Sequence, residues 1–436
     1  PGKMQAWLNQ PLFTHADVPY RIKPYAEIVK DPYNTITYDW EAASRIEARV
    51  AKRGTDGKLV VNRNGQTVHV TLTEKLLNLL LAKLVNFVPD GGIWMNTQRP
   101  EWNDANNALV GKGLSVVTTS YLRRYVVFFR ALLAGAPAEL TLSEDLHTLF
   151  VAVQQSLATY EATPTLTDQD RRAIVAALGK AGSDYRAACY GDLSIEHVQV
   201  YRDALSAFLS TTEAALNRTI AANRREDALY HAYNTLHLGE GIAQVRYLQV
   251  MLEGQVAALS AGLLEPDAVL DLLTALREST LYRADQHSYI LYPDKDLPGF
   301  LKKNTVDAAQ VQDMRLVRTL VQANDPRLLV KDTNGDYHFG GEMRNVQDVR
   351  ALLDQLAQQP DLAPLVAEEA GAITALFEQV FEHDRFTGRS GSFFAYEGLG
   401  SIYWHMVSKL LLAVQENVYM AAAMDRPALP ALIDAY

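Results

Sequence analysis

The chain holds a single cysteine, Cys189, among its 436 residues. One cysteine cannot form an intrachain disulfide, so the disulfide framework that supports many small secreted domains is excluded. No charged segment followed by an apolar run opens the chain, and no targeting signal is visible there. These absences favour a cytoplasmic location without excluding the periplasm.

Long apolar runs and an excess of basic residues are also lacking. The most apolar stretch, Leu76 to Val88, is broken by Asn78, Lys83 and Asn86 and is too short to cross a bilayer. The 41 Lys and Arg residues are outnumbered by 51 Asp and Glu residues, which gives a formal net charge of −10. Neither a membrane nor a nucleic acid is therefore expected as a partner, since a phosphate-backbone binder needs concentrated positive charge.

Apolar residues at helical spacing dominate the chain after its first 70 residues. Thr71-Leu-Thr-Glu74 has the pattern of a capping box ahead of such an apolar face. Further helices are expected at Ala108 to Leu133, Ser143 to Tyr160, Thr167 to Leu178, Ile195 to Ala222, Gly241 to Ala261, Pro266 to Glu278, Asp307 to Ala323, Val346 to Gln358, Leu362 to Phe381 and Gly400 to Ala423. With almost no strand signal between them, the pattern predicts an all-α array of paired helices over residues 71 to 436.

Residues 1 to 70 are expected to form a separate irregular segment with a β-hairpin. Two β-rich runs between Lys58 and Val70 flank Asn64-Gly65, which is a strong two-residue turn signal. A second hairpin is expected at Lys331 to His338, around Asn334-Gly335. The carboxylates of that segment do not have the spacing of a calcium-binding loop, and neither a metal nor another cofactor is expected.

Three long connections interrupt the helical array, at Pro89 to Asn107, Tyr282 to Asn304 and Glu382 to Gly400. They carry aromatic, histidine, arginine and carboxylate residues, whereas plain linkers are rich in Ser and Gly. Loops of this length within a compact domain are commonly functional. The chemistry of the protein is therefore expected in these loops.

The first of these loops contains Glu101-Trp-Asn-Asp104. A carboxylic acid beside an indole suits a general acid, because apolar walls raise its pKa, as protonation of a glycosidic oxygen requires. The ring of Trp102 can stack on a sugar while the amide of Asn103 bonds a hydroxyl. In the alternative interpretation, Asp104 only caps the following helix and Trp102 belongs to the core.

The run from Glu101 to Gly111 resembles the Asp-Trp-Asn-Asp-Gly-Met-Asn segment of the cellobiose-phosphorylase-like family of inverting enzymes. The resemblance implies an (α/α)₆ toroid in which the second acid of the segment, Asp104, is the general acid. Glu101 stands where the family usually has Asp, and Ala105 where it has Gly. Because only about a hundred residues precede Asp104, we expect the chain to be the C-terminal portion of a larger enzyme of this (α/α)₆ clan.

The late loop from Thr387 to His405 looks like the segment that closes such a toroid, where hydrolases of the clan carry their catalytic base. This resemblance implies Glu397 as the base, with Glu382 or Asp384 as the alternative. Phosphorylases of the clan place phosphate-binding groups in the same region.

The same loop also has chemistry that suits phosphate and sugar. The guanidinium of Arg389 and the neighbouring Ser390, Ser392 and glycine amides suit a phosphate dianion. Tyr396 and Trp404 are the candidate aromatic groups for a sugar subsite. A structural glycine-rich turn, with the aromatic residues packed in the core, is the alternative.

The middle loop, Tyr282 to Tyr292, gathers Arg283, Asp285, Gln286 and His287 between tyrosines. Saccharide subsites combine such planar hydrogen-bonding groups with aromatic platforms. A surface ion-pair cluster would have the same composition.

These features predict an inverting glycoside hydrolase that cleaves a glucan-type oligosaccharide with Asp104 as general acid. Two alternatives stay open: an inverting phosphorylase that uses phosphate, and a non-catalytic helical module that binds carbohydrate or acts as a scaffold. The expected partners are an oligosaccharide and either an N-terminal portion of the same enzyme or a second copy of the chain.

Overall fold

The computed structural model describes residues 2–62, 64–97, 109–191, 194, 196–294, 298–382 and 401–436. The chain forms two compact units. The first comprises Pro1–Arg99, Val110–Pro293 and Ile402–Tyr436, and the second comprises Pro100–Leu109 and Asp294–Ser401. None of the helices in the described ranges combines the length and the hydropathy that a membrane span requires. The domain boundary expected near residue 70 stays a prediction.

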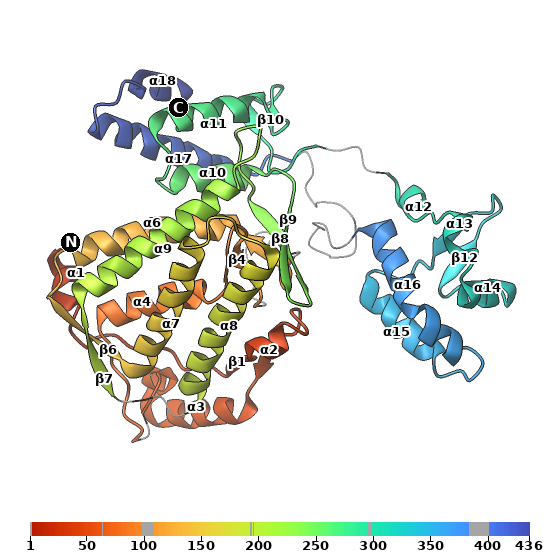
Figure 1. Ribbon diagram of the computed structural model, residues 1–436, viewed down its shortest axis with the longest axis horizontal. Coiled ribbons are helices and arrows are strands. Elements are labelled where there is room, and N and C mark those ends of the chain that lie inside the picture. Colours follow the sequence, from red (N-terminus) through yellow and green to blue (C-terminus); the bar gives the residue numbers. More distant parts are fainter. Residues whose placement is uncertain are drawn as a thin grey trace. The chain divides into compact units, whose positions relative to one another are not determined.

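Helices account for most of the first unit, as Figure 1 shows. Its α-helices are α1 (Gly2–Trp7), α2 (Tyr25–Ile28), α3 (Trp40–Arg53), α4 (Leu72–Leu84), α6 (Val116–Leu133), α7 (Glu144–Glu161), α8 (Asp168–Tyr190), α9 (Arg202–Ala222), α10 (Leu252–Ser260), α11 (Pro266–Glu278), α17 (Trp404–Ala423) and α18 (Leu429–Ala435). One 3-10 helix, η1 (Gly54–Lys58), follows α3.

The main core of this unit lies among α4, α6, α7, α8 and α9, and α7 and α8, drawn in yellow, lie side by side. Its fully buried side chains include Leu80, Phe129, Leu157, Leu178 and Phe208, with one residue from each helix. Each of these helices therefore buries one apolar face, as the helical spacing in the sequence predicts.

The start of α4 shows how the sequence fixes these helices. The hydroxyl of Thr71 accepts a hydrogen bond from the Glu74 backbone N–H at 3.1 Å, which is one of the two bonds of the expected capping box. The buried Glu74 carboxylate accepts from the backbone N–H of Ser143 at 2.9 Å and from its hydroxyl at 2.7 Å. Glu74 therefore joins the start of α4 to the start of α7.

A five-stranded antiparallel sheet, in the order β3-β4-β5-β8-β9, is the main element that the sequence pattern did not predict. Its strands are β3 (Phe87–Val88), β4 (Gly92–Trp94), β5 (Gly113–Ser115), β8 (Tyr233–Gly239) and β9 (Ile242–Tyr247). The helices expected from Ala108 and Gly241 consequently begin later, at Val116 and Leu252. Strands β3, β4 and β5 are only two or three residues long and are buried throughout, so they show no alternation and their apolar residues fit the neighbouring helical patterns.

Smaller strand pairs surround this framework. The remaining strands of the first unit are β1 (Tyr20–Ile22), β2 (Ile36–Tyr38), β6 (Glu139–Ser143), β7 (His197–Tyr201), β10 (Tyr282–Arg283) and β11 (Ser288–Tyr289). The turn expected at Asn64-Gly65 is present, where Val61 bridges Thr67 and the Asn62 carboxamide accepts from the Asn64 backbone N–H.

With 55% of the structure helical, the prediction of a mainly helical protein with a small β-element near its start is confirmed, and the array is compatible with a helical toroid.

The second unit has its own core. It contains α12 (Phe300–Lys303), α13 (Ala308–Val311), α14 (Arg315–Gln322), β12 (Leu329–Lys331), β13 (Tyr337–Phe339), α15 (Val346–Leu356) and α16 (Ala363–Phe381). Strands β12 and β13 pair antiparallel, which confirms the hairpin expected around Asn334-Gly335. The buried Glu369 carboxylate accepts from the backbone N–H groups of Arg315 and Leu316 at 2.6 and 2.8 Å and so fastens α16 to the start of α14.

Candidate active site

The segment that carries the proposed acid connects two neighbouring strands of the large sheet. Strands β4 and β5 pair antiparallel, with Trp94 opposite Leu114. Glu101, Trp102, Asn103 and Asp104 lie outside the described residues, whereas both ends of the connection are described. The structure therefore describes the base of this segment, which is the part of the sheet where the chain leaves β4 and enters β5.

Hydrogen bonds connect the chain that enters this segment to the chain that leaves it. The Met95 backbone N–H donates to the Gly113 carbonyl at 2.8 Å, and the Gly111 N–H donates to the Met95 carbonyl at 2.7 Å. The buried Trp94 indole N–H donates to the Gly111 carbonyl at 2.9 Å. Buried Asn96 adds a side-chain bond of 2.7 Å to the carboxamide of Asn86. These bonds fix the spacing between the chain entering the segment and the chain leaving it.

Gly111, where the chain leaves this segment, has a conformation and surroundings that require glycine. Its φ of 90° is strained for other residues. A Cβ atom there would lie 2.8 Å from Cδ1 of Tyr33 and 2.9 Å from the Pro32 carbonyl oxygen. The loop that precedes β2 therefore packs directly on the exit of the acid-bearing segment.

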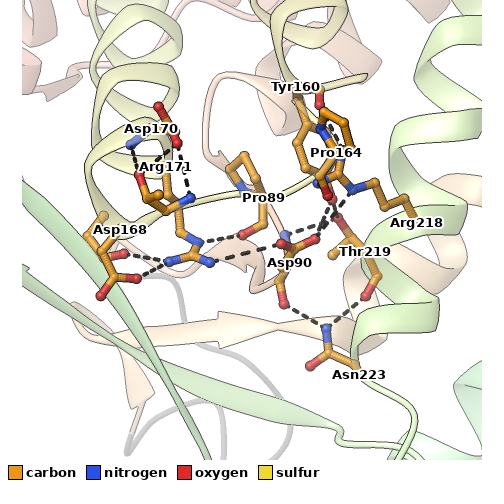
Figure 2. Close-up of polar contacts among 12 residues, drawn as sticks. Pro89, Asp90, Tyr160, Pro164, Asp168, Asp170, Arg171, Arg218, Thr219 and Asn223 are labelled. Carbon is orange, nitrogen blue, oxygen red and sulfur yellow. Dashed lines mark hydrogen bonds and ion pairs between the residues drawn. The ribbon is translucent and has the colours of Figure 1, made fainter. Parts of the chain in front are cut away.

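The turn from β3 to β4, which leads into this base, is held by a polar cluster around Asp90 (Figure 2). Asp90 has a positive φ of 60°, uncommon for a residue other than glycine. Its carboxylate accepts from the Tyr160 hydroxyl at 2.5 Å, and its backbone N–H donates to the Thr219 hydroxyl at 3.3 Å. The Asn223 side chain donates to the Asp90 carbonyl at 2.9 Å. Contacts from α7 and α9 thus stabilise the strained turn.

Two arginines complete the cluster in Figure 2. Buried Arg171, on α8, donates to the carbonyls of Pro89 and Ala243, both at 2.9 Å, and forms an ion pair with Asp168. The Arg218 guanidinium lies 4.1 Å from the centre of the Tyr160 ring. Burial, and then the bond to Asp90, raise the pKa of the Tyr160 hydroxyl, which therefore stays a neutral donor. The donors and acceptors of this cluster bond to one another, so the cluster stabilises the β3–β4 turn.

A buried carboxylate that the sequence did not single out lies close to the same sheet. Glu253, in the first turn of α10, accepts from the Tyr233 hydroxyl at 2.9 Å, and both side chains are buried. Tyr233 is paired with Ser115, directly after the base of the acid-bearing segment. The only signal in the sequence was that Glu253 is the one charged residue between Val250 and Ala258.

The middle candidate loop forms a small hairpin. Tyr282 is paired with Tyr289, and His287 occupies the turn with a positive φ of 48°. The Arg283 guanidinium donates to both oxygens of the exposed Asp285 carboxylate at 2.9 Å and lowers the pKa of that carboxyl. The ion-pair interpretation thus describes the contact that is present, and the saccharide-binding role of these residues and of Gln286 stays a prediction.

The late candidate loop is described only at its two ends. Asp384, Arg389, Ser390, Ser392, Tyr396 and Glu397 lie outside the described residues. Glu382 ends α16 in a left-handed conformation, with its carboxylate 2.9 Å from the Lys303 ammonium. Trp404 opens α17 in the first unit and is 65% exposed, so its indole is open to contact. Their proposed roles remain predictions.

Among the described residues, no group of three His, Cys, Asp or Glu side chains is arranged to hold a metal ion. In the β12–β13 hairpin, His338 lies 3.4 Å from the Asp332 carboxylate, and that carboxylate also accepts backbone bonds from Asn334 and Asp336. The carboxylate that suggested calcium in the sequence thus stabilises the turn of its own hairpin.

Comparison with known protein families gives a match in the second unit. Residues 297–384 match the GH149 phosphorylase insertion domain 2. The matched range falls within Asp294–Ser401, the larger of the two segments of the second unit, and covers about a fifth of the chain. No curated protein matches the chain. The match supports an enzyme that acts on glycosidic bonds, in agreement with the acid-bearing segment.

Proposed function

We propose that the protein is an inverting glycoside phosphorylase that acts on a glucan-type oligosaccharide. The match of residues 297–384 to an insertion domain of phosphorylases is the observation that carries this proposal. It favours phosphorolysis over the hydrolysis that the sequence pattern alone suggested. The resemblance of the Glu101 to Gly111 segment to the cellobiose-phosphorylase-like family points the same way.

In the proposed reaction, Asp104 protonates the oxygen of the glycosidic bond. An oxygen of inorganic phosphate bonds to the anomeric carbon from the opposite face as the bond from that carbon to the leaving oxygen breaks. The products are a sugar 1-phosphate of inverted configuration and a shortened saccharide. Because phosphate is the nucleophile, no protein carboxylate has to activate a water molecule.

Arg389, Ser390 and Ser392 are the proposed phosphate-binding groups. A planar guanidinium can bond two phosphate oxygens at once, and hydroxyl and glycine N–H groups can satisfy the others. Trp102, Asn103 and Glu101 are proposed to position the sugar beside the acid. In this scheme Glu382 has a structural role, since its carboxylate is engaged with Lys303 within the second unit.

The base of the acid-bearing segment supports catalysis by Asp104. A general acid must stay within hydrogen-bond reach of the oxygen that it protonates, and displacement of about 1 Å can cost roughly a hundredfold in rate. The hydrogen bonds between Met95, Gly111 and Gly113, together with the close packing at Gly111, restrict the positions of both ends of the segment.

The test is incubation with a panel of disaccharides and α- and β-linked glucan oligosaccharides, with and without inorganic phosphate. We expect sugar 1-phosphate to form, and only when phosphate is present. Reducing sugar released equally without phosphate would instead establish the hydrolase, with Glu397 or Glu382 as its base. Turnover of none of the panel under either condition would favour the non-catalytic module.

A further inference from the structure

The first and last helices of the second unit are joined by an ion pair. Lys303 is the last residue of α12, and Glu382 directly follows α16. The Lys303 ammonium lies 2.9 Å from the Glu382 carboxylate, and both side chains are partly buried. The range that matches the phosphorylase insertion domain, 297–384, begins just before α12 and ends just after Glu382. The ion pair therefore connects the two ends of the matched domain.

Two aromatic rings strengthen this connection. The ring of Phe300, the first residue of α12, stacks on the ring of Phe381, the last residue of α16, with centroids 6.2 Å apart and planes 23° apart. Phe381 is buried and lies beside Phe339 and Phe377 in the core of the unit. The end of α16 thus packs against both this core and α12.

The residue after Lys303 fixes the position of the α12 backbone. The buried Asn304 side chain donates to the Phe339 carbonyl at 2.9 Å and accepts from the Phe339 backbone N–H at 2.8 Å. The Asn304 backbone N–H donates to the Phe300 carbonyl at 2.7 Å, within the single turn of α12. The backbone beside Lys303 is thus bonded to β13, and the Lys303 ammonium extends from a fixed support.

Glu382 has a backbone conformation that needs such support. Its φ of 54° and ψ of 40° lie in the left-handed region, which is uncommon for a residue other than glycine. Residues in this region persist where surrounding contacts fix them. The Glu382 backbone N–H donates to the Glu378 carbonyl at 2.7 Å, and its carboxylate is held by Lys303. These two contacts determine the direction in which the chain leaves α16.

The chain that leaves α16 leads into the late loop, which carries Arg389, Ser390 and Ser392. We infer that Lys303 is a positioning residue for phosphate: by holding Glu382, it fixes the start of the loop that binds the nucleophile. That this loop binds phosphate rests on the proposed function. Because binding has to order the groups that contact a ligand, a loop whose start is already fixed binds phosphate more tightly.

The two substrates should respond differently to loss of the ion pair. The proposed sugar-positioning residues Trp102 and Asn103 belong to a different segment, between β4 and β5, whose base has its own hydrogen bonds. A positioning role for phosphate therefore predicts a higher KM for phosphate without a matching rise in KM for the saccharide. Partial unfolding would instead reduce the amount of active enzyme and leave both KM values unchanged.

The experiment compares Lys303→Met with Lys302→Met in the full chain. Lys303→Met keeps most of the side-chain stem and removes the charge. Lys302 is the exposed neighbouring lysine of α12, and its substitution is the matched control. Initial rates of sugar 1-phosphate formation are measured against the concentrations of inorganic phosphate and of the saccharide. We expect Lys303→Met to raise KM for phosphate about tenfold and KM for the saccharide less than about twofold, while Lys302→Met behaves like the parent protein.

Exchange of the two charges tests the same contact in a second way. The double variant Lys303→Glu/Glu382→Lys restores an ion pair of opposite orientation, so it should recover most of the phosphate affinity that Lys303→Glu alone loses. If Lys303→Met does not fold, Glu382→Gln takes its place in the comparison, since it removes the charge but keeps an acceptor for the ammonium.

A KM for phosphate in Lys303→Met that equals the value for Lys302→Met would overturn the inference, as would an equal rise of KM for both substrates. Failure of the proposed function has a different signature. In that case the parent protein itself forms no sugar 1-phosphate from any saccharide of the panel, and the positioning role is rejected together with the phosphorylase.

Discussion

The indole N–H of Trp94 donates to the carbonyl of Gly111 at 2.9 Å, across the base of the segment that carries Asp104. This bond joins the last residue of β4 to the chain that leads into β5. Both groups are buried, so we expect this bond to influence the position of the segment between them without itself taking part in chemistry.

We therefore predict that Trp94→Phe lowers kcat by about tenfold or more and also raises KM, because Asp104 and the proposed sugar-positioning residues Trp102 and Asn103 lie on the same displaced segment. The unfolding free energy should fall by roughly 1–3 kcal/mol, since the Gly111 carbonyl loses its partner. Steady-state kinetics and urea unfolding check both values. Trp7→Phe, at an exposed indole on α1, is the control. If Trp94→Phe lowers the stability but leaves kcat unchanged, Trp94 does not position the acid.

Gly111→Ala should disturb the exit of the same segment. The substitution adds a left-handed alanine and a Cβ within 2.9 Å of Tyr33 and Pro32. Gly241→Ala also places an alanine at positive φ but meets nothing within 4 Å, so it measures the conformational cost alone. We expect Gly111→Ala to be more destabilising than Gly241→Ala by about 1–3 kcal/mol, the usual cost of overpacking. Equal thermal shifts in the two variants would contradict close packing at Gly111.

Asp90→Ala should destabilise the β3–β4 turn by roughly 2–3 kcal/mol, because the buried Tyr160 hydroxyl loses its acceptor. The exposed pair between Lys180 and Asp184 provides the comparison, and Asp184→Ala should cost less than about 1 kcal/mol. Denaturant unfolding measures both. A similar small effect for both variants would show that the cluster in Figure 2 contributes no more than a surface ion pair.

Two half-buried histidines make stability depend on pH. The pKa values of His15 and His231 are both lowered to about 4, chiefly by burial. The unfolded chain binds protons at these sites below its ordinary pKa of about 6.5, whereas the folded chain does not. Their neutral forms therefore stabilise the fold fully above pH 6.5, and this contribution falls as the pH drops towards 4. The midpoint of urea unfolding should fall less steeply over this range in a His15→Gln/His231→Gln variant than in the parent protein.

The sequence predicted those parts of the fold that local patterns determine. The expected helix at Pro266 to Glu278 has the observed bounds, because its proline start and apolar period are both local signals. The Asn334-Gly335 hairpin was found for the same reason. The large sheet was missed because its strands are short and pair with distant segments, as Gly113 does with Thr235. Such pairing leaves no local period to recognise.

The candidate site was also predicted only in part. The segment from Glu101 to Gly111 was proposed from the order of its residues, because that order resembles a known family, and its role stays a prediction. The contacts that support its base could not be predicted in this way. Tyr160 meets Asp90, and Tyr233 meets Glu253, only after helices and strands have packed.

Substitutions at Asp104 and Glu101 distinguish which of the two carboxyl groups is the general acid. Asp104→Asn should lower turnover by at least about a hundredfold, the lower end of what a general acid contributes, and leave the unfolding transition in place. Glu101→Gln, three residues away in the same segment, should cost much less and is the matched control. Because a substrate with a good leaving group needs no proton, Asp104→Asn should retain most of its activity on an activated aryl glycoside when phosphate is present. If Glu101→Gln were the inactive variant, the segment would be correct and the acid wrong. If neither variant lost activity, the resemblance of this segment to the phosphorylases would carry no catalytic meaning.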